Sequence, residues 1–299
     1  MKRILLILLL FVCVQTVKAD IDLDLGDPFI RFDPEYDYYL QGFTIINNKL
    51  FLVMINDDED KPKIKVFDLD TNEEVYTKIV NGIGHANDVT FNSKDNKIYI
   101  VHGNGLSVLH VFDADSYEYL YDVEIELPAR SIAYIDDLDI YALRTVSSGY
   151  MINNEHRLYN KLPFLTGMSF TFDVGRQGWT YYKGYIYYST WSWIRFGGDG
   201  SNKILVYDLT GKLRERLVTN DDIGELENVD FYKDKMILGI NSYEDDFVEF
   251  YSIDIPEIEP LVEEDEEEET VSKKNYLWFL LIPILLIPGI IFIIKKRCK

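Results

Sequence analysis

The sequence of 299 residues predicts an all-β fold, a five-bladed β-propeller, followed by a single transmembrane α-helix. Three observations lead to this prediction. A unit of short strands joined by polar turns recurs five times between residues 41 and 256. No part of that region places apolar residues at sustained helical spacing, which argues against a helical domain. An uncharged apolar segment near the C-terminus is long enough to cross a bilayer.

Residues 1–19 have the features of a signal peptide. A basic start at Lys2 and Arg3 precedes an apolar run from Ile4 to Val14, and small residues at Val17 and Ala19 have the spacing that signal peptidase requires. The apolar run is shorter than the ~17 residues that a spanning helix needs. We therefore expect cleavage before Asp20 and export of the mature chain, with an uncleaved anchor as the alternative.

The five repeated units are recognised by their second strands, which are short and apolar. These strands begin 48, 42, 46 and 50 residues apart, at Leu50, Ile98, Ile140, Ile186 and Met236. Four-stranded propeller blades repeat at about 40–50 residues. The turn before each of these strands carries residues that tight hairpins prefer, such as Asn47-Asn48 and Lys183-Gly184. The units start near residues 41, 87, 130, 177 and 227.

Third strands also recur, and in three units an aromatic residue precedes an aspartate. These pairs are Phe67-Asp68, Phe112-Asp113 and Tyr207-Asp208. The third unit lacks the pair and looks degenerate around residues 151–162. The fifth unit ends at Pro256 before a fourth strand, while the apolar segment 28–32 belongs to no unit. We predict that this N-terminal segment completes the fifth blade, since a propeller must close. A β-sandwich, the main alternative, would not require five copies.

The propeller ectodomain is predicted to comprise residues 20–256, followed by an acidic stalk at 257–275. The stalk contains seven consecutive acidic residues, Glu263–Glu269, which repel one another and cannot bury apolar surface, so we expect it to be extended and disordered. Calcium or a basic partner on this run is the alternative.

Residues 276–294 are predicted to be the transmembrane helix, with the lipid bilayer as its partner. The tail at 295–299 is basic and should stay cytoplasmic by the positive-inside rule. The prediction is a single-pass protein of the cell membrane, with its N-terminal domain outside the cell.

Composition excludes one class of partner. The formal net charge is −21 at pH 7, whereas proteins bind nucleic-acid backbones through Lys and Arg, so we expect no nucleic-acid partner.

The two cysteines, Cys13 and Cys298, lie in the predicted signal peptide and tail. The ectodomain is thus expected to be stabilised by its core without disulfides. Cys298 lies where acylation is an alternative to an idle thiol.

The candidate binding residues begin with the polar openings of the five units, which share one phase of the repeat. They are Gln41, Asn87, Asp88, Arg130, Gln177, Glu227 and Asn228. In a propeller such positions converge around the mouth of the central channel, where they can bind a small polar ligand, a sugar or an ion. The alternative is that they satisfy one another and nearby backbone groups, as buried polar groups must.

No strong catalytic or metal-binding pattern occurs in the sequence. The four histidines are spread apart without a His-Glu-x-x-His pattern. We expect His85 and His102 toward opposite rims and His110 packed within a strand. No serine lies in a Gly-x-Ser-x-Gly context. We therefore assign no catalytic residue, no metal ligand and no cofactor, and leave calcium open.

The segment from Trp179 to Phe196 is rich in aromatic residues. Its alternating tyrosines are expected to pack between blades. Trp191 and Trp193 are expected in an insertion loop beside Arg195, where an exposed aromatic pair with an arginine suits recognition of a protein or a glycan. Packing within the rim is the alternative.

The stretch GHANDVTFNSKDNKIYIVH at Gly84–His102, with Gln-Gly openings at Gln41 and Gln177, resembles exported propellers built from YVTN-like and NHL-like repeats. In particular it is similar to five-bladed propellers of Gram-positive secreted proteins, including helveticin-like bacteriocins. The resemblance implies a propeller fold and no single activity, because propellers carry unrelated functions.

A second resemblance is to propeller-type glutaminyl cyclases, through Gln41-Gly42 early in the chain and Glu225-Leu226-Glu227 late. That family usually has Thr before the Gln-Gly pair, whereas Leu40 stands here.

The expected function is a membrane-anchored extracellular module that binds a protein or glycan at one rim. The alternative is a tethered enzyme, cyclase-like or a glycan hydrolase, using Glu227 with Gln41, Asp88 and Arg130.

Overall fold

The computed structural model describes residues 20–35, 38–56, 61–103, 106–146, 148–162, 174–192, 201–219, 224–242 and 247–258. These residues form strands and turns without a helix, so the described part of the chain contains no helix that could cross a membrane. The predicted signal peptide, transmembrane helix and basic tail lie outside the described residues, as does the predicted stalk after Ile258; Ile258 itself packs against the core between blades 4 and 5.

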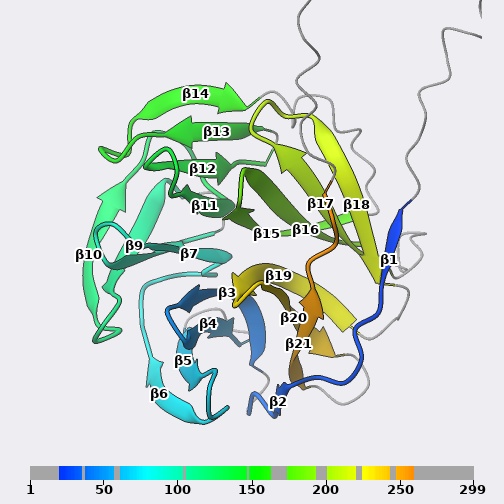
Figure 1. The fold of residues 1–299 in the computed structure, drawn as a ribbon. Coiled ribbons are helices and arrows are strands. Elements are labelled where there is room, and N and C mark those ends of the chain that lie inside the picture. Colours follow the sequence, from blue (N-terminus) through cyan, green and yellow to red (C-terminus); the bar gives the residue numbers. More distant parts are fainter. Residues whose placement is uncertain are drawn as a thin grey trace, which may run out of the picture. The chain divides into compact units, whose positions relative to one another are not determined.

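Five sheets are arranged around a central axis, which confirms the predicted five-bladed β-propeller (Figure 1). Blade 1 contains β3 (Tyr39–Ile46), β4 (Lys49–Ile55), β5 (Lys63–Asp68) and β6 (Glu74–Ile79). Blade 2 contains β7 (Asp88–Asn92), β8 (Lys97–Val101), β9 (Val108–Asp113) and β10 (Tyr119–Glu124). Blade 3 contains β11 (Ser131–Ile135), β12 (Ile140–Arg144), β13 (Gly149–Ile152) and β14 (Leu158–Leu162). The third unit, expected to be degenerate, is therefore a regular four-stranded blade.

Blades 4 and 5 are completed by strands from the N-terminal end of the described chain. Blade 4 contains β15 (Val174–Tyr182), β16 (Tyr185–Ser192), β17 (Asn202–Asp208) and β18 (Leu213–Thr219). Blade 5 contains β19 (Gly224–Tyr232), β20 (Lys235–Ser242) and β21 (Val248–Asp254). The short strand β2 (Ile30–Phe32) pairs antiparallel with β21, as predicted for ring closure. A second short strand, β1 (Ile21–Leu23), pairs in parallel with β18 and was not predicted.

The repeated sequence motifs have a local structural cause. The hairpin turns use the left-handed backbone conformation, as at Asn47, Asn96 and Asp139, where the φ angles are 57°, 56° and 55°; Asn and Asp tolerate this conformation better than most residues. The aspartate that ends the third strand accepts hydrogen bonds from the next turn. Asp68 Oδ1, for example, accepts them from the backbone N–H groups of Asp70 and Thr71 at 2.8 and 3.2 Å. The aromatic-Asp pair therefore marks the turn into a fourth strand.

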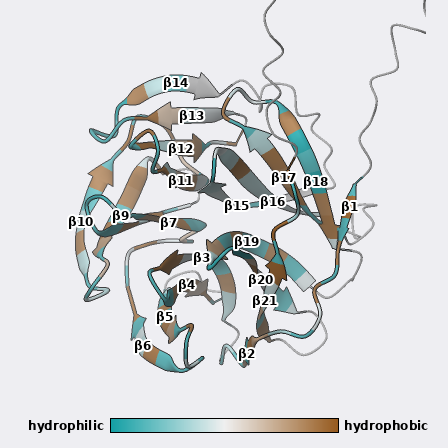
Figure 2. Ribbon diagram, in the orientation of Figure 1, coloured by the Kyte–Doolittle hydropathy of each residue, from teal (hydrophilic) through white to brown (hydrophobic). Residues whose placement is uncertain are grey.

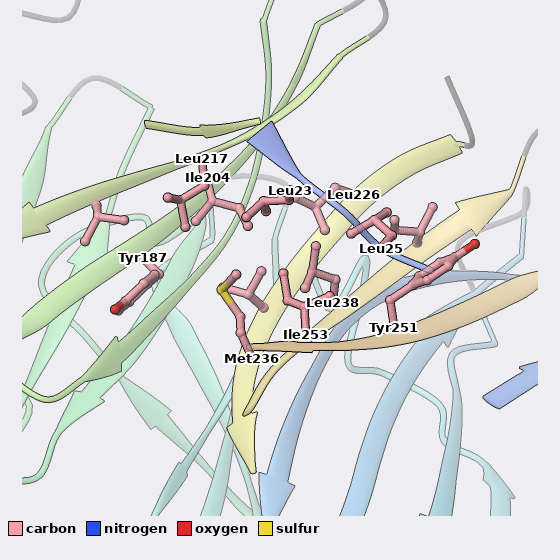
Figure 3. Packing of buried hydrophobic residues seen from close by; sticks show 13 residues of the cluster. Leu23, Leu25, Tyr187, Ile204, Leu217, Leu226, Met236, Leu238, Tyr251 and Ile253 are labelled. Atoms are coloured by element: carbon pink, nitrogen blue, oxygen red, sulfur yellow. The ribbon is translucent and has the colours of Figure 1, made fainter. Parts of the chain in front are cut away.

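Each apolar core lies between two neighbouring blades, so that five cores form a closed ring. Figure 2 shows hydrophobic residues concentrated on inner strands such as β3 and β4, with more hydrophilic residues on the outer strand β6. In the core between blades 4 and 5, Leu23 and Leu25 from the N-terminal segment pack with Leu217 and Leu226 (Figure 3). The N-terminal segment, residues 21–32, therefore joins blades 4 and 5 through both backbone pairing and side-chain burial.

We expect Leu23→Ala to lower the free energy of unfolding by about 2–4 kcal/mol, because it empties a site in this core. The Leu23 side chain is 8% exposed, whereas that of Leu120 on an outer strand is 43% exposed. Leu120→Ala is thus the matched control and should change the free energy by less than about 0.5 kcal/mol. Urea unfolding of residues 20–258 measures both. Equal effects of the two substitutions would show that the N-terminal segment does not stabilise the ring.

Candidate functional site

The axis of the propeller is closed by a buried carboxylate. Asp88, at the start of β7, is 0% exposed. Its Oδ1 accepts hydrogen bonds from its neighbour Val89 N at 2.9 Å and from Asn228 Nδ2 at 3.3 Å. Its Oδ2 accepts hydrogen bonds from Ile132 N and Trp179 N, both at 3.0 Å. One side chain therefore connects blade 2 with blades 3, 4 and 5.

Asn228, at the corresponding position of blade 5, extends this network to the remaining blade. Its Nδ2 also donates to the backbone carbonyl of Phe43 in blade 1 at 3.1 Å, and its Oδ1 accepts from Val229 N at 2.8 Å. Both side chains are fully buried. Asp88 and Asn228 together reach all five blades, which is a structural use of two predicted binding residues.

The glycines of the two Gln-Gly openings make room for this network. A Cβ added to Gly178 would lie 2.5 Å from Asn228 Cγ, and one added to Gly42 would lie 3.1 Å from Asp88 Cα. Any other residue at 178 would displace the Asn228 side chain. The Gln-Gly motif is therefore explained here by close approach of the innermost strands.

Of the other predicted channel-mouth residues, Asn87 and Gln177 bond to neighbouring blades, whereas Glu227 and Gln41 bond within their own blades. Asn87 Nδ2 donates to the carbonyl of Arg130 at 2.8 Å, and Gln177 Nε2 donates to Glu225 Oε1. Glu227 Oε1 accepts from Asn241 Nδ2 at 2.8 Å. Gln41 is buried, with Nε2 donating to the carbonyl of Leu40 at 3.2 Å. Arg130 lies half-buried just before β11.

Three further residues of this region were not singled out from the sequence. Arg144, at the end of β12, is 4% exposed and donates from Nε to Ser131 Oγ at 2.9 Å and from a terminal nitrogen to the Gln177 carbonyl at 3.2 Å. Asn241 bonds both the N–H and the carbonyl of Leu40, at 2.8 and 3.0 Å. Glu225 was noted only as part of a motif. A charged or amide residue ending an apolar strand is the signal that marks Arg144 and Asn241.

Burial changes the acidity of the carboxyl groups around the axis. It raises the pKa of Asp88 to about 7, against the opposing effects of the N–H donors and of Arg144. It also raises the pKa of Glu225 to about 7, against the hydrogen bond from Gln177. The pKa of Glu227 is raised well above its usual value by burial and by the charges of Glu225 and Asp88. In the next layer, burial raises the pKa of Asp230 to about 6. The axial carboxyls therefore take up protons more readily in the folded chain.

The aromatic segment divides into a packed part and a part outside the described residues. Trp179, Tyr187 and Tyr188 are buried between blades, as expected for the alternating aromatics. Trp191 is a half-buried residue of β16, and its backbone pairs with that of Asn202. The insertion loop of blade 4 therefore begins later in the chain than the sequence suggested. Trp193 and Arg195 lie outside the described residues.

The histidines do not lie as expected. Gly103, next to His102, is so close to His85 that an added Cβ would lie 2.9 Å from the His85 Cβ, and Ala86 N donates to the His102 carbonyl at 3.1 Å. The expectation of opposite rims is therefore wrong, because the chain returns along the hairpin of blade 2. His110 is 3% exposed, as a packed strand residue should be, and contacts His102 Nδ1 at 2.8 Å and Asp122 at 2.6 Å. Among the described residues, no group of three His, Cys, Asp or Glu side chains is suited to a metal ion.

A pocket of about 520 Å³ lies away from the axis, in blade 1. Its lining residues come from β5, β6, the end of β4 and the segment before β3: Glu35, Tyr38, Asn56, Lys63, Lys65, Glu74, Thr77, Lys78 and Ile79. None of the predicted binding residues lines it. The sequence signal is a pair of lysines with alternate spacing in a strand, Lys63 and Lys65, which places both side chains on one face.

No protein-family model matches the sequence, and no curated protein matches it. Among solved structures, the chain is similar to hydrazine synthase of Kuenenia stuttgartiensis, with 11% identity over 78% of this chain and 60% of that one and a TM-score of 0.40. It is also similar to the RRP9 WD40 repeats, with 11% identity, 73% and 63% coverage and a TM-score of 0.42. For BamB from Moraxella catarrhalis the values are 14%, 71%, 59% and 0.34. The chain spans about three fifths of each of these proteins, and the likenesses carry no argument about function.

We expect Asp88→Asn to destabilise the propeller by about 2–4 kcal/mol, because its amide nitrogen must face one of two pairs of hydrogen-bond donors. Unfolding of residues 20–258 in urea at pH 8 measures the loss. The control is Asp122→Asn, whose side chain is 50% exposed and is bonded only to its own blade in the described structure. A stable Asp88→Asn variant would contradict the structural role of the carboxylate.

The raised pKa values predict that stability falls as pH rises. The pKa values of these carboxyls are near 4 in the unfolded chain and are raised by burial in the folded chain, to about 7 for Asp88 and Glu225, so the folded state binds more protons above pH 4. Asp70 and Asp139, with pKa values lowered to about 2, act in the opposite sense only below about pH 4. His102 and His156, whose pKa values are lowered by burial, also act in the opposite sense, below about pH 6.5, but they are outnumbered by the buried carboxyls. The melting temperature should be highest near pH 4 to 5 and lower by about 5 °C or more at pH 8.

Glu227→Gln provides the internal test of this pH dependence, since Gln resembles the protonated carboxyl. At pH 8 the variant should melt at a higher temperature than the natural chain, and at pH 5 the two should agree. A variant with an unchanged slope of melting temperature against pH would show that Glu227 is not responsible.

Proposed function

We propose that this protein is a membrane-anchored binding module that holds a protein partner outside the cell. The observation that carries the proposal is the closed axis: Asp88 and Asn228 are used to join the blades, so their polar groups are already bonded within the protein. The predicted signal peptide, the acidic stalk at 257–275 and the apolar segment 276–294 support export and anchoring. The resemblance to exported YVTN-like, NHL-like and helveticin-like propellers supports the same cellular setting.

The outer edges of blades 1–3 supply the proposed contact surface. Large apolar side chains there are between 42% and 68% exposed: Val75 and Ile79 on β6, Tyr119, Leu120 and Tyr121 on β10, and Leu158 and Tyr159 on β14. In the sheets described, β6, β10 and β14 are outermost strands, whose backbone groups can pair with an added strand. Blade 4 already accepts such a strand from its own chain, because β1 pairs with β18. We therefore propose that the partner presents an extended segment to the β10 edge, where three of these exposed residues are consecutive.

The test is site-specific crosslinking of the full-length chain on intact cells. A photoreactive phenylalanine analogue at position 121 should give one discrete protein adduct, and Tyr119→Ser in the same chain should remove it. The same analogue at position 138, an exposed turn residue of blade 3, is the control and should give no adduct.

The sequence predicts a second contact surface at Trp191, Trp193 and Arg195, of which only Trp191 is among the described residues. Replacing Trp191 and Trp193 together by Ala in the position-121 chain separates the two surfaces. An adduct that survives Tyr119→Ser and disappears with the tryptophan pair would overturn the edge assignment in favour of the rim of blade 4.

An enzymatic role is the second candidate, favoured by one observation. Glu225 is half-buried, with its pKa raised to about 7 beside the more buried Glu227, and coupled carboxyls of this kind serve as acid and base in catalysis. Gln41 and Gln177 would then bind substrate near them. Turnover of N-terminal glutaminyl peptides or cell-wall glycans that is lost in Glu227→Gln would establish this role.

A further inference from the structure

The blade 1 pocket is a built site with a chemistry unlike the rest of the molecule. The whole chain has a formal net charge of −21, yet three lysines line this pocket: Lys63, Lys65 and Lys78. Lys78 is exposed and is paired with Glu118. The side chains of Lys63 and Lys65 are only 8% and 7% exposed. Buried ammonium groups are costly unless they are paired, and they are rarely retained without a partner of opposite charge.

The two buried lysines are compensated to different extents. Lys65 Nζ lies 2.8 Å from Glu74, and its ion pair is complete. Lys63 Nζ lies 3.8 Å from Glu35, whose side chain is 57% exposed, and donates a long hydrogen bond of 3.3 Å to the Pro34 carbonyl. It also lies 3.9 Å from the centre of the Tyr38 ring. Burial lowers the pKa of Lys63, which Glu35 opposes and Lys65 reinforces. An anion entering the pocket would therefore gain most beside Lys63.

The same pocket contains a buried hydrogen-bond acceptor, Asn56 Oδ1. Asn56 Oδ1 is buried and has no hydrogen-bond partner among the described residues, and Asn56 lines the pocket. A buried acceptor left without a donor costs about 1–3 kcal/mol. A ligand with a hydroxyl or N–H group would satisfy it.

We propose that this pocket binds a sugar acid, with its carboxylate beside Lys63 and a hydroxyl donating to Asn56. Lys65 is paired with Glu74, whereas Lys63 is incompletely paired with Glu35, so the buried part of the pocket has about one positive charge to offer, which a singly charged carboxylate matches. A volume of about 520 Å³ accommodates one or two sugar rings. This binding goes beyond the proposed protein contact: Ile79 of β6 belongs to both surfaces, but the charged and polar contacts of the ligand lie in the blade 1 pocket, away from the β10 edge.

The test is calorimetric titration of the purified full-length chain with D-glucuronate, using glucose and inorganic phosphate as comparison ligands. At pH 8 glucuronate should bind at least about tenfold more tightly than either, since glucose has no charge and inorganic phosphate is mainly doubly charged at this pH. Lys63→Met should weaken glucuronate at least about tenfold. Methionine keeps the buried stem of the side chain and removes the charge, so the blade should stay folded, which the melting temperature checks.

Lys94→Met is the matched control, because Lys94 is 64% exposed and lies on blade 2. It should leave glucuronate binding unchanged. Asn56→Leu should reduce the preference for glucuronate over acetate, which lacks the hydroxyl groups. Equal binding of glucose, a stronger response to phosphate, or unchanged glucuronate binding in a folded Lys63→Met chain would each overturn the proposal.

The sugar-acid site and the proposed protein contact can be confirmed or refuted independently of each other. Crosslinking at position 121 without any glucuronate binding would remove the sugar-acid site and leave the protein contact in place. Glucuronate binding without a discrete adduct would do the reverse.

Discussion

The ring depends on one buried carboxylate at its axis. Asp88 accepts hydrogen bonds from backbone N–H groups of β11 and β15 and from Asn228 in β19, and Asn228 in turn bonds the carbonyl of Phe43 in β3. Innermost strands of a propeller converge, which leaves little space for side chains at the centre. Gly42 and Gly178 provide that space. The apolar cores between blades can form only in the register that these central bonds allow.

This arrangement has an electrostatic cost that shapes the behaviour of the whole domain. Burial raises the pKa values of Asp88, Glu225 and Glu227, and for Glu227 the charges of Glu225 and Asp88 add to this effect. Arg144 is a buried cation that acts against this for Asp88. Stability is therefore linked to protonation in the sense opposite to that of a surface ion pair, whose carboxylate is stabilised in its charged form.

Both binding sites that we propose lie outside the axis, toward the periphery of the ring. The N-terminal segment uses the outside of blades 4 and 5 for closure, through β1 and β2. Blades 1–3 keep their outer edges, with exposed apolar residues on β6, β10 and β14. The pocket in blade 1 lies where the segment after β2 passes β5 and β6, so the N-terminal part of the chain, which closes the ring, also forms one wall of the proposed sugar-acid site.

The fold was predictable from the sequence, because alternating apolar residues, turn residues and the aromatic-Asp motif act within one blade and repeat at blade spacing. The sequence also predicted closure by residues 28–32, since the fifth unit lacked a strand. The roles of the polar residues, in contrast, depend on contacts between blades. Asp88 and Asn228 are 140 residues apart. No local sequence pattern therefore shows that they bond to each other, or that their polar groups are used to join the blades. The same reason hid the parallel strand β1, the position of His85 beside the residue after His102, and the pocket around Lys63, each of which depends on segments brought together by ring closure or hairpin return.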